Sequence, residues 1–167
     1  LAPQSALRHP DQIRSLALIE PVAFGVLDPV ADGDALEADR TVIDSFARHR
    51  EEESGIAAFI EAWNQSAWQD LPEALRRQFL AMAPQIYQEA SAVSADRTDL
   101  SAYQAIVQPI LLSCGGNSPL PARRVVERLA GLPAAAEIAW MEEAGHMSVL
   151  REPERFAPAI AAHIAGG

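Results

Sequence analysis

Three short segments of the chain are almost continuous in apolar side chains. They cover residues 15–19, 109–114 and 136–141, and each is followed at once by polar residues or glycine. A short apolar run without alternation is typical of a strand that is buried on both faces of a parallel sheet. The pattern therefore predicts three strands of this kind.

Helical patterns follow the second and third of these strands. In residues 121–129 apolar side chains recur every three or four positions, and Gly131 is placed to end the helix. Residues 153–164 carry a similar apolar stripe, and residues 5–9 predict the end of a further helix before Pro10. The order strand, helix, strand, helix predicts an α/β protein. In such a protein the functional loops lie at the carboxyl ends of the parallel strands.

The stretch from residue 34 to residue 106 is poor in strand patterns and helical throughout. Residues 35–64 predict one or two helices with a break at Gly55, and residues 72–82 and 84–93 predict two more, each opening near a proline. At helical spacing, aromatic residues most often form ordinary core between helices, although they could also line an apolar pocket. The aromatic residues of this insertion are Phe46, Phe59, Trp63, Trp68, Phe79, Tyr87 and Tyr103.

Composition excludes several classes of function. The 167 residues are 49% hydrophobic, and 13 basic against 23 acidic side chains give a formal charge of −10, which repels nucleic acid and anionic membrane surfaces. No apolar run approaches the roughly 20 residues of a membrane span. The single cysteine, Cys114, suits a reducing compartment, and we expect a cytoplasmic protein. Leu1 stands where an initiator methionine would, so we also expect the chain to be part of a longer protein.

His146 is the first candidate for chemistry. It lies just after the third predicted strand and before the last helix, in the segment Gly145-His146-Met147. A histidine at the active edge of a sheet can act as a general base near neutral pH. The alternative is a histidine that only caps or packs a connection, and position alone does not separate the two.

The surrounding residues resemble the α/β-hydrolase superfamily. Gly145-His146-Met147, with Glu152-Pro153-Glu154 opening the last helix, is similar to the histidine loop of these enzymes. Residues 8–21 look like the helix and strand that follow their nucleophile elbow, and residues 109–119 look like their penultimate strand and its loop. The resemblance implies a partial α/β-hydrolase fold of three parallel strands with flanking helices. Residues 1–33 and 107–167 would belong to its core, and residues 34–106 would be an inserted helical cap.

The resemblance also implies roles for individual residues. His146 would be the base of a nucleophile-His-acid triad. Many members carry an aspartate after the penultimate strand, but here Ser118 stands at that position beside Asn117. Some members, the haloalkane dehalogenases among them, take the acid from the end of the preceding strand, which matches Glu20. The alternative for Glu20 is a solvated or merely hydrogen-bonded side chain, and Asp28 is the reserve candidate for the acid.

The sequence lacks a nucleophile of the expected kind. It contains no Gly-x-Ser-x-Gly elbow, and Ser5, Ser113 and Cys114 lie in segments where that turn cannot form. The oxyanion-hole donors that the family takes from the elbow and an earlier loop are missing as well. We therefore expect the nucleophile to lie outside this chain. The four histidines are too scattered for a metal site, and we expect no metal and no cofactor.

Two functions remain open from the sequence. The first is the C-terminal part of a hydrolase that acts on a small apolar substrate, with the missing N-terminal half as its partner. Esters, carbon-carbon bonds beside ketones, epoxides and carbon-halogen bonds are all compatible with it. The second is a non-catalytic hydrolase half, truncated or degenerate, that serves as a binding or interaction module. The sheet edge separates them, because strand 15–20 would have to pair with a strand that this sequence lacks, and an apolar parallel strand left open would promote association.

Overall fold

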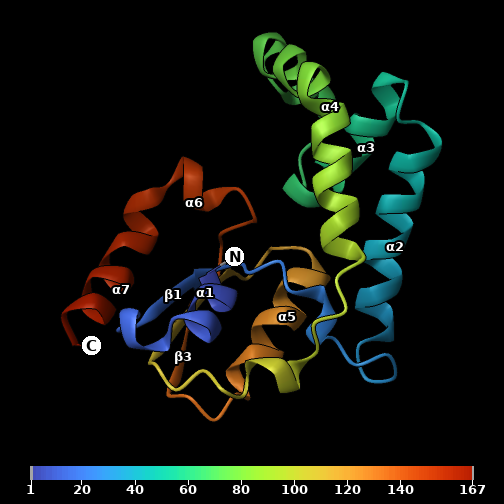
Figure 1. The fold of residues 1–167 in the computed structure, drawn as a ribbon. Coiled ribbons are helices and arrows are strands. Elements are labelled where there is room, and N and C mark those ends of the chain that lie inside the picture. Colours follow the sequence, from blue (N-terminus) through green and yellow to red (C-terminus); the bar gives the residue numbers. More distant parts are fainter. Residues whose placement is uncertain (1, 167) are drawn as a thin grey trace.

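The computed structural model describes residues 2–166, and its centre is a parallel sheet of three strands (Figure 1). The strands are β1 (Leu16–Ile19), β2 (Ile110–Gly115) and β3 (Ala136–Met141), in the order β1-β2-β3. Leu112 of β2 is in register with Leu18 on one side and Ile138 on the other. The predicted α/β class and the three predicted strands are confirmed.

The helices follow the strands and fill the long insertion. Short 3-10 turns also occur at Pro10–Gln12, Phe24–Val26, Trp68–Asp70 and Leu100–Tyr103. The α-helices are α1 (Ala2–Arg8), α2 (Gly33–Arg48), α3 (Glu53–Asn64), α4 (Glu73–Ser94), α5 (Leu120–Ala130), α6 (Ser148–Arg151) and α7 (Pro153–Gly166). In Figure 1, α2, α3 and α4 stand together as a group beside the sheet region, and α6 and α7 lie on the other side. None of the helices in residues 2–166 is long and apolar enough to cross a membrane.

Burial differs among the three strands, and here the sequence prediction was partly wrong. All six residues of β2 are buried, as expected for the middle strand. In β1, however, Ala17 is exposed, and in β3 both Glu137 and Trp140 are exposed. The reason is position, because β1 and β3 form the two edges of the described sheet and the helices cover them incompletely. Apolar runs alone did not distinguish edge strands from the middle strand.

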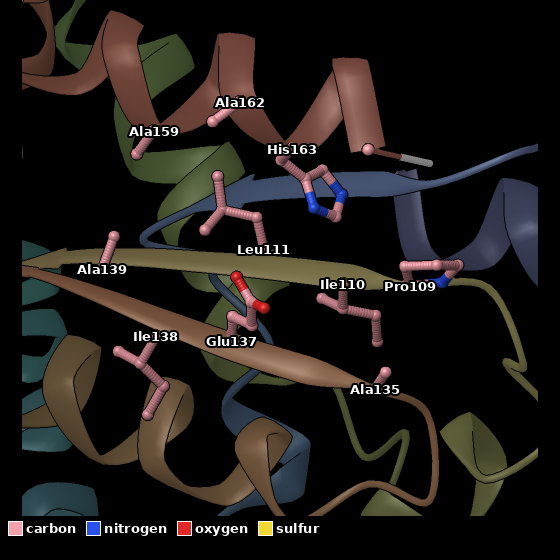
Figure 2. Close-up of a pocket in the computed structure, with 11 residues that line it drawn as sticks. Pro109, Ile110, Leu111, Ala135, Glu137, Ile138, Ala139, Ala159, Ala162 and His163 are labelled. Atoms are coloured by element: carbon pink, nitrogen blue, oxygen red, sulfur yellow. The ribbon is translucent and has the colours of Figure 1, made fainter.

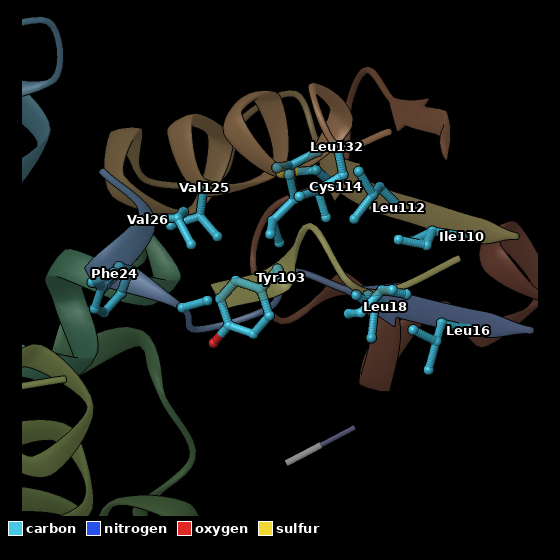
Figure 3. Packing of buried hydrophobic residues seen from close by; sticks show 14 of the residues in the cluster. Leu16, Leu18, Phe24, Val26, Tyr103, Ile110, Leu112, Cys114, Val125 and Leu132 are labelled. Atoms are coloured by element: carbon cyan, nitrogen blue, oxygen red, sulfur yellow. The ribbon is translucent and has the colours of Figure 1, made fainter. Parts of the chain in front are cut away.

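The main hydrophobic core lies between the sheet and α5. Leu18 of β1 and Leu112 of β2 pack there with Val125 of α5 (Figure 3). Tyr103, which ends the helical insertion, lies in the same core. Helix α7 contacts β2 and β3, and Leu111 of β2 lines the space beneath it. The described sheet therefore has helices on both faces, as in other α/β proteins.

The helical insertion has a second core of its own. Its buried members are Phe46, Ile56, Ile60, Trp68, Leu71 and Ala83. The predicted break at Gly55 was wrong, because α2 ends at Arg48 and Gly55 lies inside α3. A Cβ on Gly55 would come within 2.4 Å of the His49 carbonyl oxygen, so the glycine allows the two helices to turn closely.

Helix α4 runs through Pro84 without a break, although the sequence predicted two helices there. A proline inside a helix removes one backbone hydrogen bond and disfavours the helix by about 3 kcal/mol. The apolar face compensates for that loss, since Phe79, Ala83 and Tyr87 all pack in the second core on both sides of the proline. Tertiary packing thus outweighs the local preference of Pro84.

Candidate active site

Glu20 lies at the carboxyl end of β1, where the chain turns sharply. Its N–H donates to the Ser113 carbonyl of β2 at 2.9 Å, and its φ of +43° is in the left-handed region. Non-glycine residues adopt this region rarely, and the strain is often found at functional sites. The turn keeps the Glu20 side chain in the interior, with only 4% of it exposed.

Both carboxylate oxygens of Glu20 have partners. Oε1 accepts hydrogen bonds from the Gly115 N–H at 2.9 Å and from the Ser118 hydroxyl at 2.5 Å. Oε2 lies 2.5 Å from Nδ1 of His146. Glu20 and its partners together come from the carboxyl ends of all three strands, because Glu20 follows β1, Gly115 ends β2 and His146 follows β3. The structure therefore brings together Glu20 and His146, the two residues that the sequence singled out.

The loop that carries His146 is fixed against the loop after β2. The Asn117 N–H donates to the Ala144 carbonyl at 3.0 Å, and Ala144 is fully buried. A Cβ on Gly115 would lie 2.3 Å from the same Ala144 oxygen, so this close approach requires glycine. The Gly145 N–H donates to the Ser148 hydroxyl at 3.0 Å, which closes the turn into α6. The imidazole is thus held by backbone packing as well as by Glu20.

The environment of Glu20 favours its charged form. Burial raises the pKa of the Glu20 carboxyl, but the hydrogen bonds with His146, Ser118 and Gly115 lower it more, and the net pKa is below the ordinary value. The carboxylate can only accept hydrogen bonds, so the proton of the neutral imidazole lies on Nδ1. Nε2 is then the basic nitrogen, and it is the one left for a reacting group.

An aromatic wall and a small cavity adjoin His146. The ring centroids of His146 and Trp63 are 4.9 Å apart, and Trp63 also contacts Phe24 and Phe59. The cavity measures about 190 Å³ and is lined by His146 together with side chains of α2, α3 and α4. All seven aromatic residues of the insertion pack in or against the hydrophobic cores, as expected, and Phe59 and Trp63 also line this cavity.

Asp28, the reserve candidate for the acid, has a different role. Its Oδ1 accepts from the N–H groups of Val30 and Ala31, both at 2.8 Å, and these bonds lower the pKa of the carboxyl. Its own N–H donates to Asp32, whose carboxylate also accepts from Arg128 at 2.6 Å. Asp28 therefore shapes the turn that leads into α2, and Glu20 is the carboxylate that contacts His146.

The structure also describes the surroundings of Ser113, Ser5 and Cys114, the three residues named from the sequence when the nucleophile was sought. The Ser113 hydroxyl donates to the Ala139 carbonyl inside the sheet at 3.3 Å, and Ser5 is exposed on α1. Cys114 is fully buried, and burial with the nearby Glu20 charge raises the pKa of its thiol to about 12. Its thiolate form is negligible at neutral pH, so Cys114 behaves as a small apolar side chain.

Sequence reasoning missed the role of Ser118. From the sequence, Ser118 only stands where many members of the superfamily carry the aspartate. In the structure its buried hydroxyl donates to the carboxylate that holds His146. A serine at position 118 can donate a hydrogen bond to a glutamate at the end of the neighbouring strand. The combination of Ser118 with Glu20 was therefore the signal available in the sequence.

A second cavity lies apart from Glu20 and His146, between α7 and the sheet (Figure 2). It measures about 360 Å³, and Leu111, Ala159 and Ala162 are among its apolar lining residues. Its titratable side chains are Glu137 and His163. It has no convergent set of polar groups comparable with that around Glu20. In the part of the chain that the structure describes, no group of three or more His, Cys, Asp or Glu side chains is arranged to hold a metal ion.

Solved structures of several hydrolases are similar to this chain. An esterase from Exiguobacterium antarcticum matches 98% of it with a TM-score of 0.66 and 18% identity. A hydrolase from Pseudomonas aeruginosa PA01 matches 97% with a TM-score of 0.62 and 24% identity. An alpha/beta hydrolase from Sphaerobacter thermophilus DSM 20745 matches 98% with a TM-score of 0.58 and 20% identity.

These similarities cover only part of the other proteins. The chain spans 62%, 59% and 62% of the three structures, in the order given. No protein-family model matches the sequence, and no curated protein does. The sequence-based resemblance is confirmed at the level of the fold. The chain has a partial α/β-hydrolase fold, made of three parallel strands with flanking helices.

Proposed function

We propose that this chain is part of a hydrolase and supplies the base and the acid of its catalytic triad. The observation that carries the proposal is the contact between Glu20 Oε2 and His146 Nδ1 at 2.5 Å, with Glu20 Oε1 held by Gly115 and Ser118. The pair lies at the carboxyl ends of parallel strands, where α/β proteins bind their ligands. A purely structural contact would not need the imidazole to line a cavity, as that of His146 does.

His146 would move the proton in the reaction. Nε2 would accept a proton from the attacking hydroxyl or water and later return it to the leaving group. Glu20 would keep the imidazole in the required tautomer and stabilise the imidazolium while it carries the extra proton. Gly115 and Ser118 would hold the carboxylate in place. The proton abstraction by Nε2 is common to ester, carbon-carbon, epoxide and carbon-halogen substrates, because each route needs a hydroxyl nucleophile or a hydrolytic water to be deprotonated.

The cavity indicates the size and polarity of the substrate. Its volume of about 190 Å³ and its mostly apolar wall, with Phe59, Trp63 and Ile86 among the lining residues, suit a small and largely apolar molecule. We therefore propose that residues 34–106 act as a cap that binds such a substrate over His146. No cofactor is required for the proton transfer that Glu20 and His146 would perform.

The nucleophile and the oxyanion-hole donors would come from outside these 167 residues. In the described sheet β1 pairs with β2 alone, and its other edge is available for a further parallel strand. A segment that pairs there would bring its own carboxyl end close to Glu20. The proposed partner is therefore the remaining part of the same fold, seated on β1.

The Glu20–His146 contact can be tested without turnover. In proton NMR of the isotope-labelled protein, we expect a strongly downfield imidazole N–H resonance from His146, which exchanges slowly with water. Glu20→Gln removes the charge but keeps the shape, so the resonance should move upfield or vanish. The matched control is His163→Gln, which should leave the resonance unchanged. A spectrum without a downfield resonance in the wild type would contradict the proposed tautomer.

Activity tests the proposal directly in the complete protein. With a panel of short-chain nitrophenyl esters, β-diketones, epoxides and haloalkanes, His146→Ala should abolish turnover while circular dichroism stays unchanged. Glu20→Gln should lower kcat by about 10³- to 10⁴-fold, because the imidazole loses its orientation. His163→Ala is the control and should turn over normally. Turnover that survives His146→Ala would refute the triad, and a folded complete protein without turnover on any class would favour the non-catalytic binding module.

A further inference from the structure

A buried carboxylate lies in the wall of the cavity beside His146. Among the residues that line this cavity, the polar ones are Asp39, Glu89 and His146, and the rest are apolar. Asp39 comes from α2, and only 4% of its surface is exposed. Glu89 differs because it is exposed on α4 and already accepts a hydrogen bond from Gln85 at 2.8 Å.

Only one oxygen of the Asp39 carboxylate has a hydrogen-bond partner. Oδ2 accepts from the Ser94 hydroxyl at 2.5 Å. Oδ1 is buried and has no hydrogen-bond partner within residues 2–166. Arg97 is close enough to act electrostatically on Asp39, but its guanidinium donates hydrogen bonds to the carbonyl oxygens of Ser94 and Asp96. Asp39 is therefore half satisfied where it lines this mostly apolar cavity, and it also lines a more polar one beside Ser94 and Arg97.

Such an arrangement is costly for the folded protein. Burial raises the pKa of Asp39, and the hydrogen bond from Ser94 and the charge of Arg97 offset this only in part. Buried polar atoms nearly always have a partner, and an exception calls for a specific explanation. An apolar side chain of the same shape would avoid the cost. A ligand that donates a hydrogen bond to Oδ1 would supply the missing partner.

We propose that Asp39 is a specificity-determining residue, whose Oδ1 accepts a hydrogen bond from a hydroxyl or protonated amine on an otherwise apolar substrate. The inference rests on the proposed function, since the reacting bond of the same substrate would lie at His146. The cavity size supports one ring or short chain, because a cavity of about 150 Å³ holds a benzene molecule. Asp39 and His146 would then contact opposite ends of that molecule.

The charges around the cavity exclude an anionic group at this end of the substrate. Asp39 and Glu89 are both acidic, and the chain carries a net charge of −10. A carboxylate on the ligand would be repelled and would add a second acceptor where a donor is needed. The proposal therefore predicts that ligands with a hydrogen-bond donor bind more tightly than apolar ligands, and that ligands with a carboxylate bind more weakly.

Four small ligands with one apolar body test this ranking. They are benzyl alcohol, benzylammonium, toluene and benzoate, and their dissociation constants can be measured by NMR titration of the protein. At least one of the two donors should bind about tenfold or more tightly than toluene, because toluene would leave Asp39 Oδ1 without a hydrogen-bond partner. Benzoate should bind most weakly. If toluene binds as tightly as both donors, the proposal is wrong.

Two shape-matched variants assign the preference to Asp39. Asp39→Leu removes the acceptor and suits both the helix and the apolar surroundings, so the donors should fall to within about twofold of toluene. Asp39→Asn keeps an acceptor oxygen without the charge. A preference for benzylammonium should therefore be lost in this variant, and a preference for benzyl alcohol should be retained. Either result fits the proposal and identifies the donor that the site takes.

The control is Glu89→Gln on the same cavity wall, which should keep the wild-type ranking. A donor preference that survives Asp39→Leu, or one that disappears in Glu89→Gln, would overturn the assignment. The ligand ranking is measured without turnover, so it is independent of the proposed reaction. If turnover depends on His146 but the order of ligand affinities is the same in wild type and Asp39→Leu, only this inference is overturned. A ranking that depends on Asp39 in a protein without hydrolase activity would overturn the proposed function alone.

Discussion

Ser118→Ala is expected to destabilise the protein and to loosen the carboxylate that holds His146. The Ser118 hydroxyl is buried and donates to Glu20 at 2.5 Å, and only 4% of the Glu20 side chain is exposed. A hydrogen bond to a buried charged group contributes about 1.5–3 kcal/mol. The Gly115 N–H still holds the same oxygen in the variant. We therefore expect a loss of about 2 kcal/mol in the free energy of unfolding, or about 4–8 °C in Tm.

The pH dependence of this loss follows from the pKa of Glu20. Its pKa is lowered in the folded state, so its contribution to stability is present above the ordinary carboxyl pKa and is lost as pH falls through the folded value. Ser118 is one of the groups that lower this pKa. The difference between Ser118→Ala and wild type should therefore be large at pH 7 and should shrink toward pH 3.

Urea denaturation at several pH values measures this effect, and Ser101→Ala is a matched control. Ser101 also donates to a carboxylate, that of Asp99, at 2.5 Å, but both side chains are exposed. An exposed pair of this kind contributes little because water replaces the lost partner, so we expect less than about 0.5 kcal/mol. The reasoning about Glu20 would be refuted if Ser118→Ala cost no more than Ser101→Ala, or if its cost did not change with pH.

Three further predictions concern other parts of the molecule. Gly115→Ala should lower stability by about 1–3 kcal/mol in urea denaturation, because its Cβ would overlap the histidine loop, whereas Gly145→Ala, whose Cβ meets nothing within 4 Å, should be nearly neutral. Asp39→Leu should raise the free energy of unfolding at pH 7 by about 1 kcal/mol. Because the pKa of Asp39 is raised, its ionisation destabilises the folded state as pH rises, so the gain should shrink at low pH. A variant that is less stable than wild type at pH 7 would give Asp39 a structural role. Cys114, with a thiol pKa of about 12 and full burial, should resist a thiol reagent at pH 8 until urea unfolds the protein, and rapid native labelling would contradict its assignment as a core residue.

The local elements could largely be predicted from the sequence, because each depends on a pattern within a few residues. The apolar runs at residues 15–19, 109–114 and 136–141 correspond to β1, β2 and β3 within one residue at either end. The errors arose where packing overrules local preference. Pro84 lies inside a continuous α4, since the apolar face of that helix is buried on both sides of the proline.

His146 was identifiable as a candidate from its loop after a predicted strand, and Glu20 from the resemblance to enzymes that take the acid from the end of a strand. Their contact spans 126 positions in the chain, and only the parallel pairing of the three strands brings them together. The sequence had left Asp28 as an alternative acid, and only its hydrogen bonds in the turn before α2 show where that carboxylate is used. The catalytic roles of Glu20 and His146 stay predictions that the activity measurements decide.

The sequence by itself determined the class of this protein, its strands, its helical insertion and the residue types at the ends of its strands. Those features follow from hydrophobic periodicity and from glycine and proline, which act over short distances. Only the tertiary structure decided that Ser118 and Gly115 hold Glu20, and that Asp39 is buried with one oxygen unpaired. Burial and hydrogen-bond partners depend on segments that are far apart in the chain, and no local pattern records which of them meet.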